Sequence, residues 1–351
     1  MSCSKKSSSH TAVTELAVLS GGKNLMKRCK PRAAWLLVLC AFFGLYRTSD
    51  AAESSLPPAT AVYGVIATDP LYLWIAQEKG FFKKNGVNID LTHIPTNQAV
   101  QALVGGKVNF VTAGPQILEA NLAGSDTVYI MSPVNTFVFS LYSKPDITNI
   151  KALAGKTLGA TNKGTPTDIA GHMLLMQNGL KPDIDVKFAY LKEIPALVAA
   201  LQQGVIDAAL LAPPSTLTAR NFGLNELLNI TALKIPFVQH SIGTTRSYIN
   251  ANPEVVRRFV RSAAEGLDFL RKNRTDAVAI MSKYTKITDP AQLNEALDSY
   301  EKAWERIPAP SQPAIEAVLA SSENPKAKGA KWDQFIDDRF VKELIASGMF
   351  R

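Results

Sequence analysis

Short apolar runs alternate with amphipathic segments from residue 61 onward, and this alternation predicts an α/β fold. Residues 157–168 are predicted to form a short strand that turns directly into a helix. Leu158 and Ala160 have the spacing of a strand, and a helical period follows up to Asn178-Gly179. The predicted strands are 62–67, 87–94, 108–113, 128–131, 137–142, 157–161, 186–191 and 206–211. The predicted helices between them are 71–79, 98–104, 116–122, 166–177, 194–203 and a segment after Pro214.

The second half of this alternation repeats the first half. Residues 102–115 match residues 200–213 at a constant offset of 98, through a shared Ala-Leu-x-x-Gly-x-hydrophobic-Asn/Asp pattern. The breaker Ser143-Lys144-Pro145-Asp146 separates the two halves and suits a crossover between domains. The sequence therefore predicts two lobes of similar construction. From Ile242 the pattern is mostly helical, with helices expected near 253–270, 275–283, 289–304, 313–321 and 331–347.

Four predicted strand-to-helix turns place proline where a helix begins, at 68–70, 114–115, 164–166 and 212–215. In open α/β sheets such turns lie at the carboxyl ends of strands, where ligands bind, so two facing lobes would put four turns around one cleft. Thr165 is expected as an N-cap with Pro166 at the first helical position, and this helix end would attract anions and polar oxygens. An ordinary capped turn is the alternative. The predicted ligand-binding residues are Thr68, Asp69, Tyr72, Gly114, Pro115, Gln116, Asn135, Thr165, Pro166, Thr167, Pro214 and Ser215.

Asp69 has two possible roles in this prediction. As an N-cap it would serve only the helix that follows it. As a pocket carboxylate it would bind an amine.

The first 51 residues have the composition of an export leader. A basic segment at 26–32 precedes an apolar run of 14 residues at 33–46, and small residues precede a cleavage site near Ala51. Met26 is a second possible start besides Met1. Cys40 follows Leu39 rather than a small residue, which makes it a poor lipidation site.

Removing this leader changes the charge and the thiol content of the chain. The net charge of +8 falls to +2, since 30 basic and 28 acidic residues remain, and this balance does not indicate nucleic acid as a partner. All cysteines, Cys3, Cys29 and Cys40, lie in the leader. The mature chain therefore has no thiol for a disulfide, a nucleophile or a metal site.

The mature chain shows no catalytic or metal-binding motif. Its histidines, His93, His172 and His240, are not in a metal-binding spacing, and no nucleophile elbow, P-loop or dinucleotide fingerprint is present. His172 is expected to be an ordinary core or surface histidine. We therefore expect no cofactor, no metal and no enzymatic activity.

Several segments, taken in order, resemble the SsuA/TauA-like solute-binding proteins of nitrate, taurine and alkanesulfonate importers. They are residues 70–86, Pro-Leu-Tyr-Leu-Trp-Ile-Ala-Gln-Glu-Lys-Gly-Phe-Phe-Lys-Lys-Asn-Gly, the Leu153-x-Gly155-Lys156 segment and the helix start 252–259. The resemblance implies a two-lobe type II periplasmic binding protein with two crossovers and C-terminal helices packed on lobe 1. The implied segments are 59–144 and 238–351 for lobe 1 and 145–237 for lobe 2. Asn109 departs from the acidic residue usual at its position in the family.

The resemblance also implies a function. We expect a monomeric periplasmic receptor that binds a small polar or anionic solute, such as a sulfonate, carboxylate or pyrimidine, and delivers it to an ABC permease driven by a cytoplasmic ATPase. A thiamine-pyrimidine-synthase-like enzyme of the same fold is the first alternative, but the resemblance implies that it needs a cysteine-rich segment. An extracytoplasmic sensor is the second, although no apolar span follows the lobes.

Overall fold

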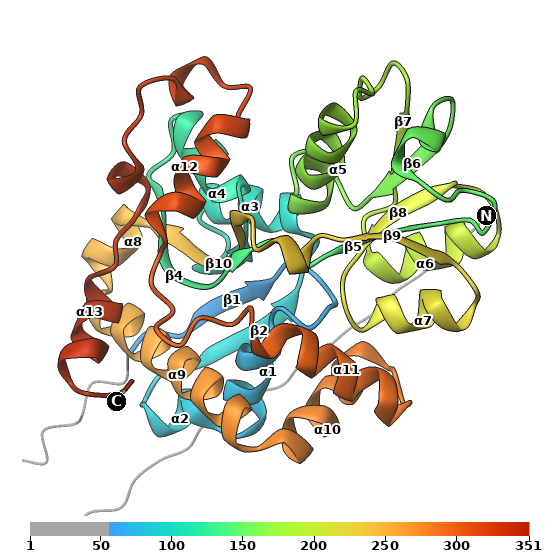
Figure 1. The fold of residues 1–351 in the computed structure, drawn as a ribbon. Helices are drawn as coiled ribbons and strands as arrows, with labels where there is room; N and C mark the ends of the chain where they lie inside the picture. Colours follow the sequence, from blue (N-terminus) through green and yellow to red (C-terminus); the bar gives the residue numbers. More distant parts are fainter. Residues whose placement is uncertain (1–55, 351) are drawn as a thin grey trace, which may run out of the picture. The chain divides into compact units, whose positions relative to one another are not determined.

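The computed structural model describes residues 56–350, so the predicted leader and its cleavage site lie outside the described residues. Within 56–350 the chain forms two five-stranded mixed sheets flanked by helices (Figure 1). We call the elements around the first sheet lobe 1 and those around the second sheet lobe 2. No helix in this range is both long enough and apolar enough to cross a membrane.

The first sheet has the strand order β2-β1-β3-β10-β4. Strand β1 runs parallel to β2 and β3, whereas β10 is antiparallel to β3 and β4. The strands are β1 (Ala59–Tyr63), β2 (Ile89–His93), β3 (Phe110–Ala113), β4 (Thr127–Thr136) and β10 (Pro236–Thr245). The helices between them are α1 (Leu71–Glu78), α2 (Phe81–Lys84), α3 (Thr96–Val104) and α4 (Gln116–Leu122).

The second sheet has the equivalent order β7-β6-β8-β5-β9, with β6 parallel to β7 and β8 and with β5 antiparallel to β8 and β9. Its strands are β5 (Ser140–Ser143), β6 (Thr157–Ala160), β7 (Lys187–Tyr190), β8 (Ala208–Leu211) and β9 (Asn225–Asn229). Its helices are η1 (Ile150–Leu153), α5 (Pro166–Gln177), α6 (Ile194–Gln202), α7 (Ser215–Asn221) and η2 (Thr231–Leu233). The predicted repeat is structural, because α3 and β3 correspond to α6 and β8 at the same offset that the sequence shows.

The C-terminal helices pack on lobe 1. Helix α9 contacts α1 and α13, and its apolar face joins the buried cluster around Trp74 and Phe110. These elements are α8 (Arg246–Ala251), α9 (Pro253–Lys272), α10 (Arg274–Thr285), α11 (Pro290–Glu301), α12 (Gln312–Ser321), η3 (Pro325–Ala327), η4 (Trp332–Phe335) and α13 (Arg339–Ala346).

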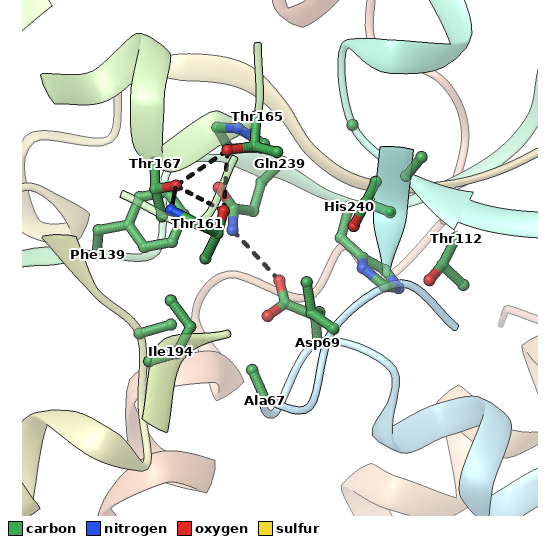
Figure 2. Close-up of a pocket in the computed structure, with 16 residues that line it drawn as sticks. Ala67, Asp69, Thr112, Phe139, Thr161, Thr165, Thr167, Ile194, Gln239 and His240 are labelled. Atoms are coloured by element: carbon green, nitrogen blue, oxygen red, sulfur yellow. Dashed lines mark hydrogen bonds between the residues drawn. The ribbon is translucent and has the colours of Figure 1, made fainter. Parts of the chain in front are cut away.

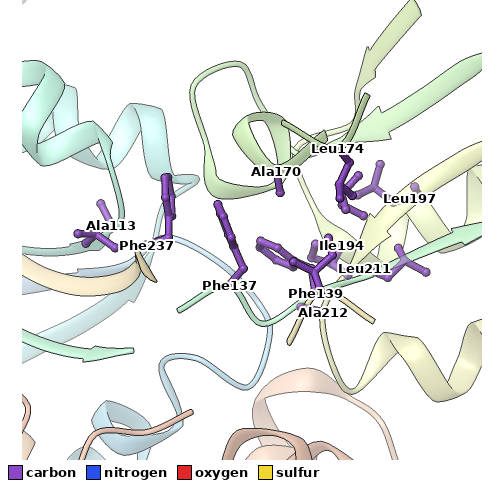
Figure 3. Packing of buried hydrophobic residues seen from close by; sticks show 14 of the residues in the cluster. Ala113, Phe137, Phe139, Ala170, Leu174, Ile194, Leu197, Leu211, Ala212 and Phe237 are labelled. Carbon is purple, nitrogen blue, oxygen red and sulfur yellow. The ribbon is translucent and has the colours of Figure 1, made fainter. Parts of the chain in front are cut away.

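Two crossovers connect the sheets, from β4 to β5 and from β9 to β10, and aromatic residues hold them together. The rings of Phe137 and Phe237, one from each crossover region, stack with centroids 4.1 Å apart. Phe139 lies beside them near Ile194 (Figure 3). The crossovers thus form one apolar junction between the lobes.

The structure corrects two predicted elements. The first strand ends at Tyr63, because the Gly64 N–H donates to the Thr112 hydroxyl and the Gly64 carbonyl accepts from the Thr96 hydroxyl instead of pairing with another strand. The helix predicted at 331–347 is divided, since Ile336 forms a bridge with Tyr129 of β4 between η4 and α13.

Strands β9 and β10 were not predicted. Strand β10 is buried along nearly its whole length, so apolar and polar residues do not alternate in it. Strand β9 is a short edge strand rich in polar residues, Asn-Glu-Leu-Leu-Asn.

Candidate ligand-binding site

A cavity with an empty volume of about 480 Å³, including the part that opens to solvent, lies where the carboxyl ends of four strands meet. The turns after β1, β3, β6 and β8 all contribute to it, as do β10 and the first crossover (Figure 2). Its lining residues are Val65, Ala67, Asp69, Thr96, Thr112, Ala113, Gly114, Phe139, Thr161, Thr165, Pro166, Thr167, Ile194, Ala212, Gln239 and His240.

Three threonine hydroxyls form a closed cluster in the turn between β6 and α5. The hydroxyls of Thr161, Thr165 and Thr167 lie 2.9–3.0 Å from one another. Thr165 is the N-cap residue and Pro166 begins the helix, as predicted, but the Thr165 hydroxyl donates to the Asn162 carbonyl at 2.6 Å rather than capping α5. Both Thr165 and Thr167 are buried.

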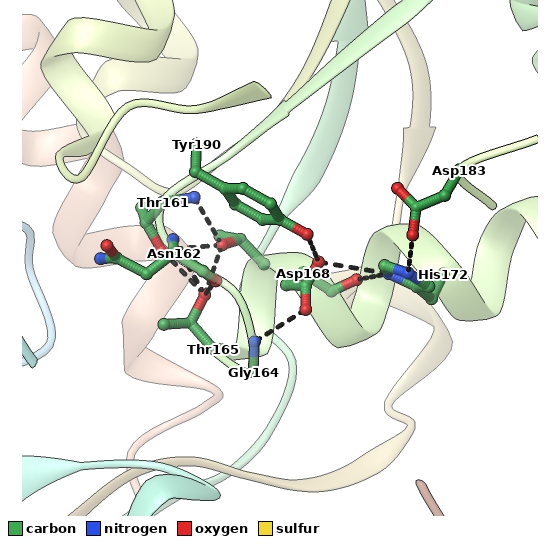
Figure 4. Close-up of polar contacts among 9 residues, drawn as sticks. Thr161, Asn162, Gly164, Thr165, Asp168, His172, Asp183 and Tyr190 are labelled. Carbon is green, nitrogen blue, oxygen red and sulfur yellow. Dashed lines mark hydrogen bonds and ion pairs between the residues drawn. The ribbon is translucent and has the colours of Figure 1, made fainter. Parts of the chain in front are cut away.

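A carboxylate behind this turn holds it in place. Asp168 accepts hydrogen bonds from the Gly164 N–H and the Tyr190 hydroxyl, each at 2.8 Å, and pairs with His172 (Figure 4). These donors hold the pKa of Asp168 below its usual range although burial opposes the shift. The hydrogen bond to Asp168 raises the pKa of His172 to about 9. His172 is therefore the satisfied histidine that we expected, and its ion pair with Asp168 supports the turn.

Asp69 is a buried carboxylate on the lobe 1 side of the cavity. The N-cap position of α1 is Pro70 and has no side-chain cap, so the N-cap role expected for Asp69 is wrong. Its oxygens accept instead from the Tyr300 hydroxyl at 2.6 Å and, weakly, from the Gln239 amide at 3.4 Å. Burial raises the pKa of Asp69 to about 6 despite these hydrogen bonds.

His240 is the other titratable residue that lines the cavity. Burial lowers its pKa to about 3, so the imidazole is neutral near pH 7. Its Nε2 lies 3.3 Å from the Tyr72 hydroxyl, which places Tyr72 directly behind the cavity wall.

Contacts between the turns join the two lobes around the cavity. The Thr68 hydroxyl donates to the Pro213 carbonyl at 2.8 Å, and the Gln116 amide donates to the Gly164 carbonyl at 3.1 Å. Gly114 is required at this junction, because a Cβ atom there would lie 2.6 Å from the Val238 carbonyl oxygen and 3.0 Å from Pro166.

The predicted site residues fall into three groups. Those that line the cavity are Asp69, Gly114, Thr165, Pro166 and Thr167. Those that join or support its turns are Thr68, Tyr72, Gln116 and Pro115, the last as the N-cap residue of α4. The others are elsewhere: Pro214 and Ser215 line a second groove beside α6 and α7, and Asn135 donates to the Ser132 and Ala309 carbonyls.

The sequence analysis missed the contribution of β10 to the site. Gln239 and His240 line the cavity because β10 lies beside β3, and that strand was not predicted. Three consecutive polar residues, 239–241, between apolar residues of the segment 237–242 were the available signal. Phe139, Thr161 and Ile194 were also missed, although each lies in a strand or helix that was predicted.

A family model described as NMT1/THI5 like matches residues 68–277, and the chain belongs to this family. The riboflavin-binding protein RibY of Chloroflexus aurantiacus is 22% identical over 201 residues, which are 55% of this chain and 56% of RibY, so the match spans just over half of that relative.

Solved structures share the fold. The alkanesulfonate-binding protein SsuA from Xanthomonas axonopodis pv. citri, bound to MOPS, aligns with a TM-score of 0.63 and 20% identity, over 75% of this chain and 91% of SsuA. The periplasmic nitrate-binding protein NrtA from Synechocystis PCC 6803 aligns with a TM-score of 0.70 and 14% identity, over 83% of this chain and 89% of NrtA. The predicted two-lobe type II fold and the SsuA/TauA-like resemblance are thereby confirmed.

Proposed function

We propose that this chain is the extracytoplasmic solute receptor of an ABC importer and that its cavity binds a small polar solute. The observation that carries this proposal is the convergence of four strand-to-helix turns, two from each lobe, on one cavity. Ligands of open α/β sheets bind at this place in the fold. Eight of the sixteen lining residues have polar side chains and the others are apolar or glycine, so the site combines apolar walls with polar groups that can orient a small molecule.

Solute capture would occur by closure of one lobe on the other. Strand β5 belongs to the second sheet and β10 begins at Pro236 in the first, so the expected lobe boundaries at 144/145 and 237/238 are wrong by one strand and by two residues. We propose that lobe 2, residues 140–229, moves against lobe 1, formed by 59–136 and 236–350, about the two crossovers. A solute that contacts both lobes stabilises the closed form through its differential affinity. The closed receptor would then deliver the solute to a permease in the inner membrane, coupled to a cytoplasmic ATPase. The predicted cleavage near Ala51 would release the receptor as a monomer in the periplasm.

Thermal shift measurements test the receptor proposal. The exported protein is mixed with sulfonates, carboxylates, amines, pyrimidines and nitrate, because a ligand that binds only the folded state raises the melting temperature. A rise for one compound class, matched by stoichiometric binding in calorimetry, supports the proposal. The same affinity in the variant Ala67→Leu, which narrows the cavity from its lining, would contradict the proposal.

The enzyme alternative has less support. A nucleophile next to a base is the usual arrangement for covalent catalysis, whereas His240, the histidine among the cavity residues, faces the Tyr72 hydroxyl. We therefore propose that the solute is released unchanged. Mass spectrometry of the bound compound after prolonged incubation checks this, and a changed mass would favour an enzyme.

A further inference from the structure

The charges in the cavity differ from those that an anion site needs. Among its sixteen lining residues, all within the described range, the titratable side chains are Asp69 and His240, and none is lysine or arginine. Asp69 is 3% exposed and His240 is also 3% exposed, so solvent screens neither group well. A sulfonate or nitrate would therefore meet a carboxyl group and a neutral imidazole, with no full positive charge to compensate it.

Asp69 has unused capacity to accept hydrogen bonds. An ionised carboxylate offers about four lone-pair positions. The described partners of Asp69 are the Tyr300 hydroxyl at 2.6 Å and the Gln239 amide at 3.4 Å, which is a long contact. No ion pair among the described residues includes Asp69. A buried carboxylate without a cation is unfavourable unless a ligand supplies the missing donor.

Gln239 adds a second free acceptor next to Asp69. Its Nε2 faces Asp69, and its Oε1 is buried with no hydrogen-bond partner. Figure 2 shows the Gln239 and Asp69 side chains directed toward each other within the set of cavity residues. Because buried polar atoms are nearly always paired in native structures, an unpaired acceptor beside a carboxylate indicates a ligand with N–H donors.

The other side of the cavity complements a different part of such a ligand. The threonine cluster at the start of α5 lines this side, and although its hydroxyls bond to one another and to the Asn162 carbonyl, the weak positive end of the helix there suits a carbonyl or hydroxyl oxygen. Phe139, Ile194 and Val65 provide apolar walls between the two polar ends.

We propose that the solute is a small nitrogen compound, neutral or cationic, whose N–H groups donate to the Asp69 carboxylate and the Gln239 Oε1, and that free anions such as sulfonates and nitrate are excluded. This inference rests on the proposed receptor function and specifies its ligand class. The ligand body is apolar, and an oxygen or ring acceptor at its other end faces the start of α5. The chain thus differs in ligand charge from the sulfonate- and nitrate-binding proteins whose fold it shares.

Four probes distinguish the possible ligand classes by calorimetry: benzylamine as a cation, 4-aminopyrimidine as a neutral N–H donor, and benzenesulfonate and nitrate as anions. The exported protein should bind at least one nitrogen probe at least tenfold more tightly than either anion. Asp69→Asn should weaken benzylamine binding at least tenfold, and should weaken 4-aminopyrimidine less because an amide oxygen still accepts one hydrogen bond. Asp276→Asn, the same change at an exposed ion pair with Lys79, should change neither affinity by more than twofold.

A second variant guards against misfolding of Asp69→Asn. Gln239→Met keeps the side-chain volume and removes the free acceptor, so it should weaken the binding of 4-aminopyrimidine at least fivefold. Thermal unfolding followed by circular dichroism shows whether each variant is folded. Preference for an anion, or nitrogen-probe affinities unchanged in both folded variants, overturns this inference and leaves the receptor proposal standing. Binding of none of the four probes also overturns this inference, and the thermal-shift panel then decides the receptor proposal separately.

Discussion

At the scale of single residues, the buried carboxyl group of Asp69 links the ligand site to protein stability. Its pKa is about 6 in the folded protein and 3.8 in an unfolded chain, because burial disfavours the charged form. Below pH 3.8 the carboxyl group is protonated in both states and does not destabilise the fold. As the pH rises through 6, Asp69 ionises in the buried site and the free energy of unfolding falls. The unliganded receptor carries this unfavourable charge at neutral pH.

This linkage predicts how Asp69→Asn changes stability with pH. The amide does not ionise, so the stability of the variant relative to wild type should increase by about 2 kcal/mol between pH 4 and pH 7. His240 has a lowered pKa and titrates in the opposite sense, but it is present in both proteins and cancels. Urea denaturation at each pH measures the difference. Asp276→Asn gives the baseline for losing an exposed carboxylate, and the same pH trend in both variants would refute the role of Asp69.

The turns of the site could be predicted where proline fixes the start of a helix. Pro70, Pro115 and Pro166 mark helix starts, so the sequence located three of the cavity turns without any structure. It did not give the directions of side chains. The sequence permitted both roles for Asp69, and its inward direction depends on Tyr300, which lies 231 residues away.

At the scale of elements, the internal repeat includes one equivalent side-chain hydrogen bond in each lobe. The Asn109 side chain accepts from the Thr60 N–H at 2.8 Å before β3, and the Asp207 side chain accepts from the Thr157 N–H at 2.9 Å before β8. The departure of Asn109 from the family's acidic residue thus keeps the same contact. Each side chain ties the start of its strand to the neighbouring parallel strand.

This equivalence predicts the effects of two substitutions at one position. Asn109→Ala leaves the Thr60 N–H without its partner and should reduce the free energy of unfolding by about 1–2 kcal/mol. Asn109→Asp keeps an acceptor there, as Asp207 does in lobe 2, and should stay within about 0.5 kcal/mol of wild type. Urea denaturation of the three proteins decides the matter. Equal losses in both variants would show that the amide has a role that the repeat does not explain.

Elements with a clear period or a proline start were predicted closely, and buried or edge strands were not. Helix α4 has the predicted bounds, and α6 differs by one residue at its end. Strand β10 was missed because it is buried between β3 and β4, where apolar and polar residues need not alternate. Its polar residues Gln239 and His240 line the cavity and interrupt the apolar run that would have indicated a buried strand.

At the scale of the whole described molecule, the two lobes also meet away from the cavity. Helix α7 of lobe 2 contacts α11 on lobe 1, where Arg220 forms an ion pair with Glu295 and the Thr218 hydroxyl donates to Gln292 at 3.1 Å (Figure 1). These side chains belong to different lobes, so the contacts form only when the lobes are together. They stabilise the form in which the cavity is buried.

The last prediction concerns this contact between α7 and α11. Glu295→Ala removes the ion pair with Arg220 without touching a cavity residue, so it should shift the population toward separated lobes. Exposed ion pairs contribute about 0.2–1 kcal/mol, which corresponds to a loss of up to about fivefold in affinity for the tightest nitrogen probe.

Calorimetry measures the affinity, and small-angle scattering of the unliganded protein should give a larger radius of gyration for the variant. Asp268→Ala is the matched control, because it removes an exposed ion pair with Lys272 inside a single helix, α9, and should alter neither quantity. If both variants bind the probe equally well, the α7–α11 contact does not contribute to closure. The affinity would then depend on the turns around the cavity alone.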